Sequence, residues 1–198
     1  MTYYPWVHDD EDDSLAWVEY TADFLLESPD EHLIHEGVSV NRWVPPDLVF
    51  DLSEDYGVKL SDSVPNLLGL LIVSEKLKTL LEKKASAQIE FLSIRLRNPK
   101  RRLVPNPYFI ANVLGSIECV NLKKTKCTWS AMDPDQMHRI KKLVLDEPRI
   151  GPEANLFRLK EELRVFVARE DLGMSIVDAK CTGMIFQDLD DYGSEWRD

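Results

Sequence analysis

The sequence predicts an α+β protein with mixed or antiparallel sheets and short helices, and it is compatible with two related strand–helix–strand lobes. A chain of 198 residues with 44% hydrophobic and 30% charged side chains suits one domain with a packed core. Short runs of β-forming residues are separated by prolines, as in sheets of short strands. Two further segments, each between such runs, carry apolar side chains at helical spacing.

The first elements are expected to be short. Met1–His8 is rich in β-forming residues and predicts a strand. Apolar residues recur near helical spacing over 15–26, which predicts a short helix. Two strands are then expected at His32–Val40 and Leu48–Leu52, separated by the turn-forming pair Pro45-Pro46.

The middle of the chain has the clearest pattern. Leu67–Ile72 is an apolar strand or its approach, and Ser74 after it is a good N-cap. The helix that follows Ser74 places three leucines on one face, at i, i+3 and i+4, namely Leu77, Leu80 and Leu81. Strands are predicted at Ile89–Leu96 and, after prolines that break the chain, at Tyr108–Leu114.

The last third of the chain predicts two more helices among extended segments. Asp133-Pro134 opens a helix over 135–143, and Arg169–Ala179 carries apolar residues at helical spacing. The extended segments are 117–122, 156–159, 164–167 and 183–189.

An internal similarity links two of these regions. A shift of 95 residues places 67–96 on 162–191, with Ile72 on Val167 and Leu77 on Leu172. Both regions then predict strand, short helix and strand, which suggests a weak internal repeat. We divide the chain into an acidic, aromatic N-terminal segment, 1–47, packed on a main α+β domain, 48–198.

The negative charge is concentrated at the start of the chain. Residues 1–41 contain eleven acids and no Lys or Arg, so they account for the whole net charge of −11. The five consecutive acids Asp9–Asp13 repel one another and predict a solvated loop. A second acidic and aromatic cluster lies near the end, at 188–198.

These clusters have two interpretations. They are either solubilising surface loops or a docking surface that presents carboxylates and an aromatic anchor to a basic partner. Direct contact with a nucleic acid backbone is disfavoured by the charge. The predicted partner-binding residues are Trp6, Asp9, Asp10, Glu11, Asp12, Asp13, Glu19, Asp23, Asp188, Asp190 and Asp191.

Membrane and secretory classes are not favoured. The longest apolar run, Leu67–Val73, is far shorter than the roughly 20 residues that cross a bilayer. The first residues lack the basic start and apolar stretch of a signal peptide, so we expect a cytoplasmic protein without a membrane partner. Three cysteines without metal or redox spacing predict reduced thiols: Cys119, Cys127 and Cys181.

No motif predicts catalysis, a metal or a cofactor. His32 and His35 could ligate a metal from one helix face, but no third ligand is identifiable. Cys119 and His138 could form a nucleophile and base, but an apolar strand around the thiol would leave it inert. The basic stretch Arg95–Arg102 pairs with the acidic segment, binds a phosphate or solvates a turn. A second basic group, Lys123–Lys126, lies in an expected loop.

Several short phrases, in the same order along the chain, resemble a bacterial family, the immunity protein eleven family of polymorphic and interbacterial toxin systems. The phrases are Leu52-Ser53-Glu54-Asp55-Tyr56, Lys59-Leu60-Ser61-Asp62, Asn66-Leu67-Leu68-Gly69, Ile72-Val73-Ser74-Glu75-Lys76-Leu77, Glu90-Phe91-Leu92, 108–114, Ile117-Glu118-Cys119-Val120 and Leu156-Phe157-Arg158-Leu159. Asn121 departs from the family, which tends to have Asp there, and the acidic start is more variable.

The resemblance implies a cytoplasmic, non-catalytic protein that binds a cognate toxin, such as a nuclease-type effector delivered by type VI secretion. Binding would occlude the active site or substrate path of the toxin, and a basic toxin surface would suit the acidic segment. The resemblance supplies no catalytic residue and no cofactor. Two alternatives remain: an acidic nucleic-acid mimic that regulates a DNA-binding protein, and a small carboxylate-dependent enzyme.

Overall fold

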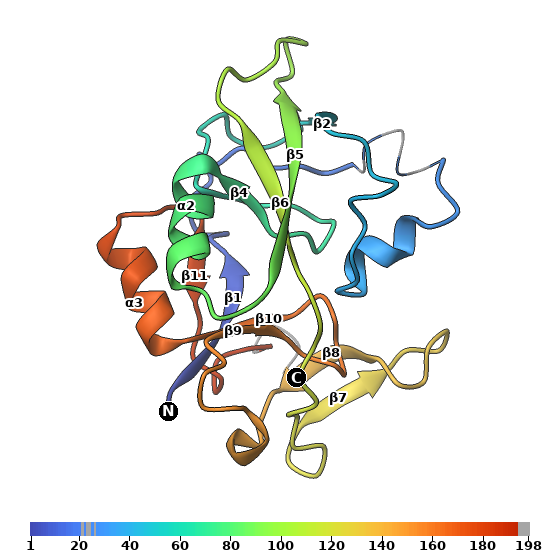
Figure 1. Cartoon of the computed structure of the whole chain (residues 1–198), viewed down its shortest axis with the longest axis vertical. Helices are drawn as coiled ribbons and strands as arrows, with labels where there is room; N and C mark the ends of the chain where they lie inside the picture. Colours follow the sequence, from blue (N-terminus) through green and yellow to red (C-terminus); the bar gives the residue numbers. More distant parts are fainter. Residues whose placement is uncertain (21, 23–24, 26, 194–198) are drawn as a thin grey trace.

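Strands dominate the fold, which is seen in a computed structural model that describes residues 1–20, 22, 25 and 27–193 (Figure 1). The described residues contain eleven strands in three sheets, two α-helices and two short 3-10 helices, which confirms the predicted α+β class. No helix among them is long and apolar enough to cross a membrane.

The larger sheet has five strands in the order β2-β5-β6-β4-β3. Its strands are β2 (Leu48–Asp51), β3 (Ser63–Val64), β4 (Ile72–Ser74), β5 (Ile89–Arg97) and β6 (Tyr108–Val113). Neighbouring strands in this sheet are antiparallel except β2 and β5, which are parallel to each other, so the sheet is mixed.

The second sheet combines both ends of the chain, in the order β11-β1-β10-β9. Its strands are β1 (Tyr3–His8), β9 (Leu156–Arg158), β10 (Phe166–Arg169) and β11 (Met184–Phe186). β1 is therefore an interior strand, paired with β10 on one side and β11 on the other. The remaining pair, β7 (Lys126–Trp129) and β8 (Met137–Lys142), is a separate hairpin.

The two α-helices occupy equivalent positions in the two large sheets. α2 (Glu75–Lys84) connects β4 to β5, and both of these strands pair with β6 between them. α3 (Glu170–Asp178) connects β10 to β11, and both pair with β1 between them. The helices begin 95 residues apart, which is the shift of the internal similarity. We therefore propose that the shared topology reflects an internal repeat.

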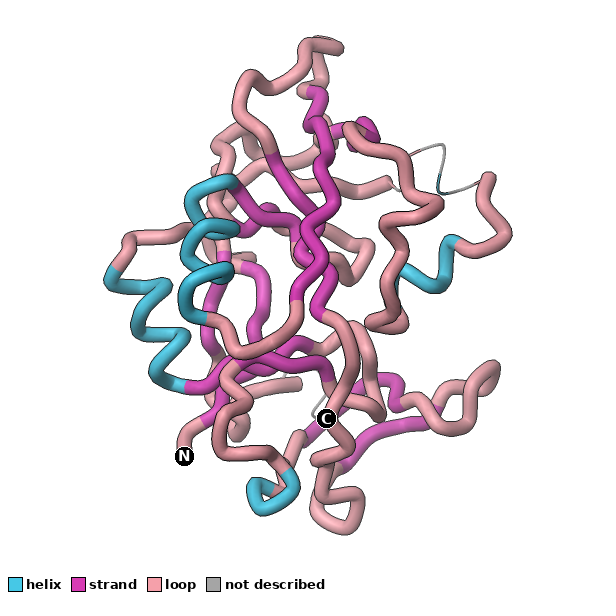
Figure 2. Tube along the Cα trace, viewed as in Figure 1, coloured by secondary structure: helices cyan, strands magenta, loops and turns pink. Residues whose placement is uncertain are grey.

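The two helices also lie beside each other, at one side of the molecule (Figure 2). Between them and the sheets lies a common apolar cluster that includes Leu77 and Leu81 of α2 and Leu172 and Ile176 of α3. Ser74 caps α2 as predicted, because its side chain accepts a hydrogen bond from the backbone N–H of Leu77. The cluster joins the two sheets into one body.

One predicted helix, 135–143, is wrong. The segment forms β8, in which Met137 and Ile140 are buried three positions apart. Arg139 has φ 33° and is skipped in the register, since Thr128 pairs with His138 and Cys127 with Ile140. This extra residue is a bulge that turns the two-residue spacing of a strand into a helix-like spacing of three.

A predicted strand is also wrong, and a predicted helix is wrong over its described start, although Leu25 near its end is helical. The strand expected at 32–40 is instead a 3-10 helix, η1 (Glu31–His35), followed by a turn. The helix expected over 15–26 is not formed by its described start: Leu15 and Val18 make isolated strand-like bridges to Lys59, Leu52 and Asn66. Residues 21, 23, 24 and 26 lie outside the described residues. The other 3-10 helix, η2 (Glu147–Arg149), was not predicted.

Candidate docking surface

The five consecutive acids form the loop that leaves β1, as their charge predicts. The loop begins where Asp9 donates a backbone hydrogen bond to the carbonyl of Gly183, at 3.4 Å. Its side chains divide into two kinds. Asp10, Glu11 and Asp13 are exposed, whereas Asp9 and Asp12 are half-buried.

Asp12 holds the loop in place. Its carboxylate accepts hydrogen bonds from Lys59 Nζ at 2.8 Å and from the backbone N–H of Ser14 at 3.0 Å. The bond from Lys59, followed by those from Ser14, lowers the pKa of Asp12 to about 2. We therefore assign Asp12 to positioning the loop and leave the three exposed acids for contact with a partner.

A second segment, residues 53–59, lies directly against the acidic segment. Lys59 is bonded to both Ser14 and Ala16: Lys59 N–H donates to the Ser14 carbonyl at 2.9 Å, and Ala16 N–H donates to the Lys59 carbonyl at 2.9 Å. Gly57 sits at the closest approach, because a Cβ atom there would lie 2.0 Å from the Ser14 carbonyl oxygen. Only glycine fits at this position without moving the backbone.

The contact between these segments gathers aromatic and aliphatic side chains with the acids. Trp17 stacks on Tyr56 with ring centres 5.0 Å apart and planes inclined by 20°. Tyr20, Tyr56 and Val58 are 67%, 40% and 84% exposed. We call the resulting surface the acidic face; it comprises Asp10, Glu11, Asp13, Tyr20, Glu54, Asp55, Tyr56 and Val58.

The other predicted partner-binding residues lie in different places. Glu19 borders the acidic face, where its carboxylate accepts a hydrogen bond from Ser53 Oγ at 2.9 Å. Trp6 is only 7% exposed, and its ring packs edge-on against Phe186 in the core. It therefore offers little surface as an anchor. Asp23 lies outside the described residues.

The two acidic clusters are not brought together. β11 runs antiparallel to β1, with Met184 opposite His8 and Phe186 opposite Trp6. The chain that follows β11 consequently continues toward the start of β1, whereas the acidic loop leaves from its end. The acids there are exposed, at the far end of β1: Asp188, Asp190 and Asp191.

Four residues of the acidic face were not predicted from the sequence: Glu54, Asp55, Tyr56 and Val58. A signal was present, because two acids, an aromatic residue and a β-branched residue surround Gly57 within five positions. Their proximity to the acidic loop could not be derived from this pattern, since it depends on bridges between distant segments, such as Leu15 to Lys59.

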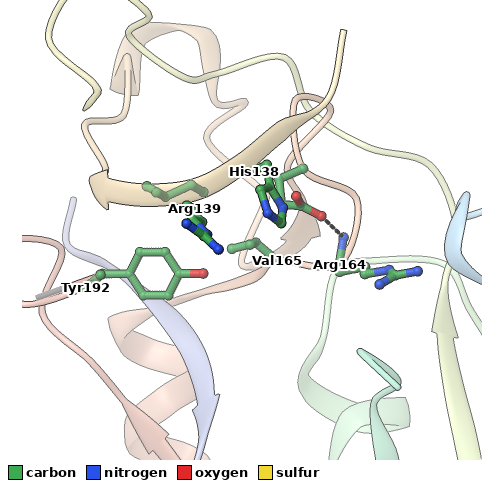
Figure 3. A pocket seen from close by; sticks show the side chains of 8 residues that line it. His138, Arg139, Arg164, Val165 and Tyr192 are labelled. Atoms are coloured by element: carbon green, nitrogen blue, oxygen red, sulfur yellow. Dashed lines mark hydrogen bonds between the residues drawn. The ribbon is translucent and has the colours of Figure 1, made fainter. Parts of the chain in front are cut away.

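A pocket near the end of the chain has a different chemistry (Figure 3). It encloses about 410 Å³, and its walls are formed by β8, the segment before β10 and residues 192–193. His138, Arg139 and Arg164 contribute basic groups, and Glu162 accepts a hydrogen bond from the Arg164 backbone. Burial raises the pKa of Glu162. Glu162 is the only carboxylate among the described residues that line this pocket.

The remaining candidate groups have structural surroundings. Cys119 is fully buried, and burial raises the pKa of its thiol to about 12, so it is a poor nucleophile. No three His, Cys, Asp or Glu side chains within the described ranges are grouped to hold a metal, and His32 instead approaches Glu36 at 3.8 Å. In the basic stretch, Arg97 forms a two-bond ion pair with Asp51 of the neighbouring β2.

A half-buried histidine, His8, lies beneath the acidic face, and from it we predict a pH effect. The ring of His8 packs edge-on against Trp17, and burial lowers its pKa from 6.5 to about 4. The unfolded chain therefore binds a proton below pH 6.5 that the folded chain does not. The contribution of this histidine to the free energy of unfolding is fully present above pH 6.5. On acidification the free energy of unfolding falls by about 1.4 kcal/mol per pH unit until the pKa of the folded state is reached.

We expect His8→Phe to reduce this pH dependence by about one proton. Chemical denaturation at pH values between about 7 and 5 measures the slope, in a window where few carboxylates titrate. His35, whose pKa burial also lowers to about 4, supplies the remaining histidine contribution. An unchanged slope in the His8 variant would contradict the assignment.

Comparison with known proteins adds a family. A family model described as "Immunity protein family (Imm11)" matches residues 3–191 of the chain. A search of curated proteins found no match. The matched region includes both large sheets, both helices, the β7–β8 hairpin and the whole acidic face.

Proposed function

The chain belongs to the Immunity protein family (Imm11), and from this premise we propose that it binds and neutralises a cognate antibacterial toxin in the cytoplasm of the producing cell. The protein acts by stoichiometric occupation of the toxin, without turnover. The acidic face is the docking surface, with Asp9, Asp12 and Glu19 supporting it from its border.

The observation that carries this proposal is the coincidence of charge and exposed apolar area. Five exposed acids and three exposed apolar or aromatic side chains lie on two segments that contact each other, and the ion pair between these segments, Lys59 with Asp12, includes none of the five acids. Interfaces commonly combine aromatic anchors with complementary charge. The face therefore suits a basic protein surface.

A basic toxin surface has a functional meaning. Enzymes that act on nucleic acids bind their substrate through positive clefts, so an acidic inhibitor can occupy the substrate path. Complementary charge also accelerates encounter, which favours capture of the toxin before it reaches its target. A nuclease-type toxin is consequently the partner class that fits the acidic face best.

Reversing the exposed acids is expected to weaken toxin binding. In the variant Asp10→Lys, Glu11→Lys, Asp13→Lys, we expect affinity at about 50 mM NaCl to fall at least about tenfold, mainly through slower association. The midpoint of thermal unfolding should change little, because all three side chains are exposed and Asp12 keeps its bonds. Calorimetry and association kinetics with the protein encoded by the adjacent reading frame measure both quantities.

A matched control reverses three exposed acids away from the face: Asp188→Lys, Asp190→Lys and Asp191→Lys. This variant has the same net charge and should bind more tightly than the first. Equal losses of toxin affinity in both variants would show that binding depends on the net charge of the protein and not on the acidic face. Toxicity of the neighbouring protein that persists when this chain is co-expressed would reject the immunity function itself.

A further inference from the structure

The β7–β8 hairpin is a second surface of opposite charge. Residues 122–142 contain six basic and two acidic side chains, a net charge of +4, so the rest of the chain carries −15. The hairpin lies on the other side of the molecule from α2 and α3 (Figure 2), and Met137 and Ile140 of β8 attach it to the core. Its strands pair only with each other.

Two lysines of the hairpin lie directly opposite each other across its two strands, in an arrangement that destabilises the pairing. Lys126 and Lys142 are direct register partners, and both are exposed. Like charges opposite each other on paired strands are destabilising. None of the ion pairs in the described part of the chain includes Lys123, Lys124, Lys126 or Lys142. No carboxylate in those ion pairs therefore neutralises the positive charge of these four lysines.

Exposed apolar side chains accompany these lysines. Trp129 at the end of β7 is 46% exposed, and Met132 in the connecting turn is 97% exposed. We call this surface the basic hairpin; it comprises Lys123, Lys124, Lys126, Trp129, Met132 and Lys142. The lysines lie toward one end of the hairpin and Trp129 and Met132 toward the other, so the hairpin presents cations and apolar groups along its length. This combination fits a protein surface that offers both carboxylates and apolar side chains.

The acidic face of the same protein has this chemistry. It presents five exposed acids around Tyr20, Tyr56 and Val58. We propose that the basic hairpin of one copy docks on the acidic face of a second copy. Such a contact joins two different surfaces, so it is a head-to-tail contact.

Long-range repulsion between copies of net charge −11 opposes this contact only in part. At physiological ionic strength, charges more than about 8 Å apart are largely screened, whereas groups in contact are not. A contact made by one hairpin is small and therefore weak, with a dissociation constant of about 10 to 100 μM. The acidic face is also our proposed toxin site, so toxin binding would compete with self-association.

Sedimentation velocity over a concentration series tests the contact with the protein alone. We expect the wild-type protein to self-associate at about 150 mM NaCl and to be monomeric at about 1 M. The variant Lys123→Glu, Lys124→Glu, Lys126→Glu, Lys142→Glu should be monomeric throughout. A control with equal net charge reverses four exposed bases elsewhere, Lys83→Glu, Lys84→Glu, Lys100→Glu and Arg102→Glu, and should still associate more strongly than the hairpin variant.

A mixing experiment identifies the two surfaces. The acidic-face variant Asp10→Lys, Glu11→Lys, Asp13→Lys keeps a native hairpin, and the hairpin variant keeps a native acidic face. Each alone should be monomeric, whereas their equimolar mixture should form a one-to-one dimer. If the glutamate variant folds poorly, glutamine at the same four positions serves in the same experiment.

Three results would overturn the proposal. They are monomeric wild-type protein at all concentrations, a hairpin variant that associates as the wild type does, and a mixture that stays monomeric. Binding of duplex DNA through the hairpin by a protein that never self-associates would assign the hairpin to nucleic acid instead. None of these results bears on toxin binding by the hairpin variant, which the proposed function expects to persist.

Discussion

Replacing Arg158 with alanine is expected to lower the free energy of unfolding by about 3 to 5 kcal/mol. Arg158 is 2% exposed, and no ion pair of the described residues includes it. Its guanidinium instead donates to the carbonyls of Val113 at 2.8 Å and Leu163 at 2.7 Å, and to the side-chain oxygen of Asn112 at 3.2 Å. Removing the donors leaves these buried acceptors unpaired.

The position of Arg158 explains why the loss is expected to be large. The residue belongs to β9 of one sheet, whereas Val113 and Asn112 belong to β6 of the other. Its guanidinium also lies 4.4 Å above the ring of Phe166, within cation–π distance. Burial lowers the pKa of Arg158 to about 10, so the side chain remains charged at neutral pH. One side chain thus connects both sheets.

Urea denaturation of Arg158→Ala measures this loss, with Arg158→Lys as the conservative variant. Lysine keeps the charge but cannot reproduce the planar set of donors, so we expect an intermediate loss. Arg149→Ala is the matched control: this arginine is half exposed and pairs with Glu118 at 3.1 Å, a pair expected to contribute less than about 1 kcal/mol. Equal effects at positions 158 and 149 would refute the role of burial.

Gly57→Ala is expected to lower the free energy of unfolding by about 2 to 3 kcal/mol and to weaken toxin binding as well. The new Cβ atom would lie 2.0 Å from the Ser14 carbonyl oxygen and 2.7 Å from that of Asp13. Both atoms are backbone, so the acidic loop itself must move away from residues 53–59. The displaced loop would separate Asp13 from Tyr56 and divide the acidic face.

Denaturation and toxin affinity should both respond to this one methyl group. Gly151→Ala is the control, because nothing lies within 4 Å of a Cβ atom there and its φ is not positive. We expect it to leave both quantities nearly unchanged. Loss of stability at Gly57 with native affinity would place the docking site elsewhere than the acidic face.

Local patterns predicted the central elements well. The boundaries of α2 follow from Ser74 as N-cap and from the leucine spacing, both of which act within the helix itself. The helix predicted at 135–143 was wrong for an equally local reason. The bulge at Arg139 changes the spacing of the buried apolar residues in β8, and the amino-acid composition does not reveal a bulge. The strand predicted at 32–40 was wrong because residues 31–35 instead form η1, in which Ile34 is the buried residue.

The candidate site was predicted in part. The acidic loop follows from the run of charges, since self-repulsion alone keeps those residues solvated. The contribution of residues 54–58 and the separation of the two acidic clusters depend on how distant segments pair. The antiparallel pairing of β11 with β1 decides the second of these, and local sequence does not determine such a register.

The interior position of β1 has a consequence for synthesis in the cell. Its partners β10 and β11 are made about 160 and 180 residues later, so the first strand cannot pair until nearly the whole polypeptide has been synthesised. The anchor of the acidic loop on Gly183 is completed in the same final stage. A ribosome-bound or prematurely terminated chain would therefore give no protection, and a cell would need its stock of finished protein before the toxin arrives.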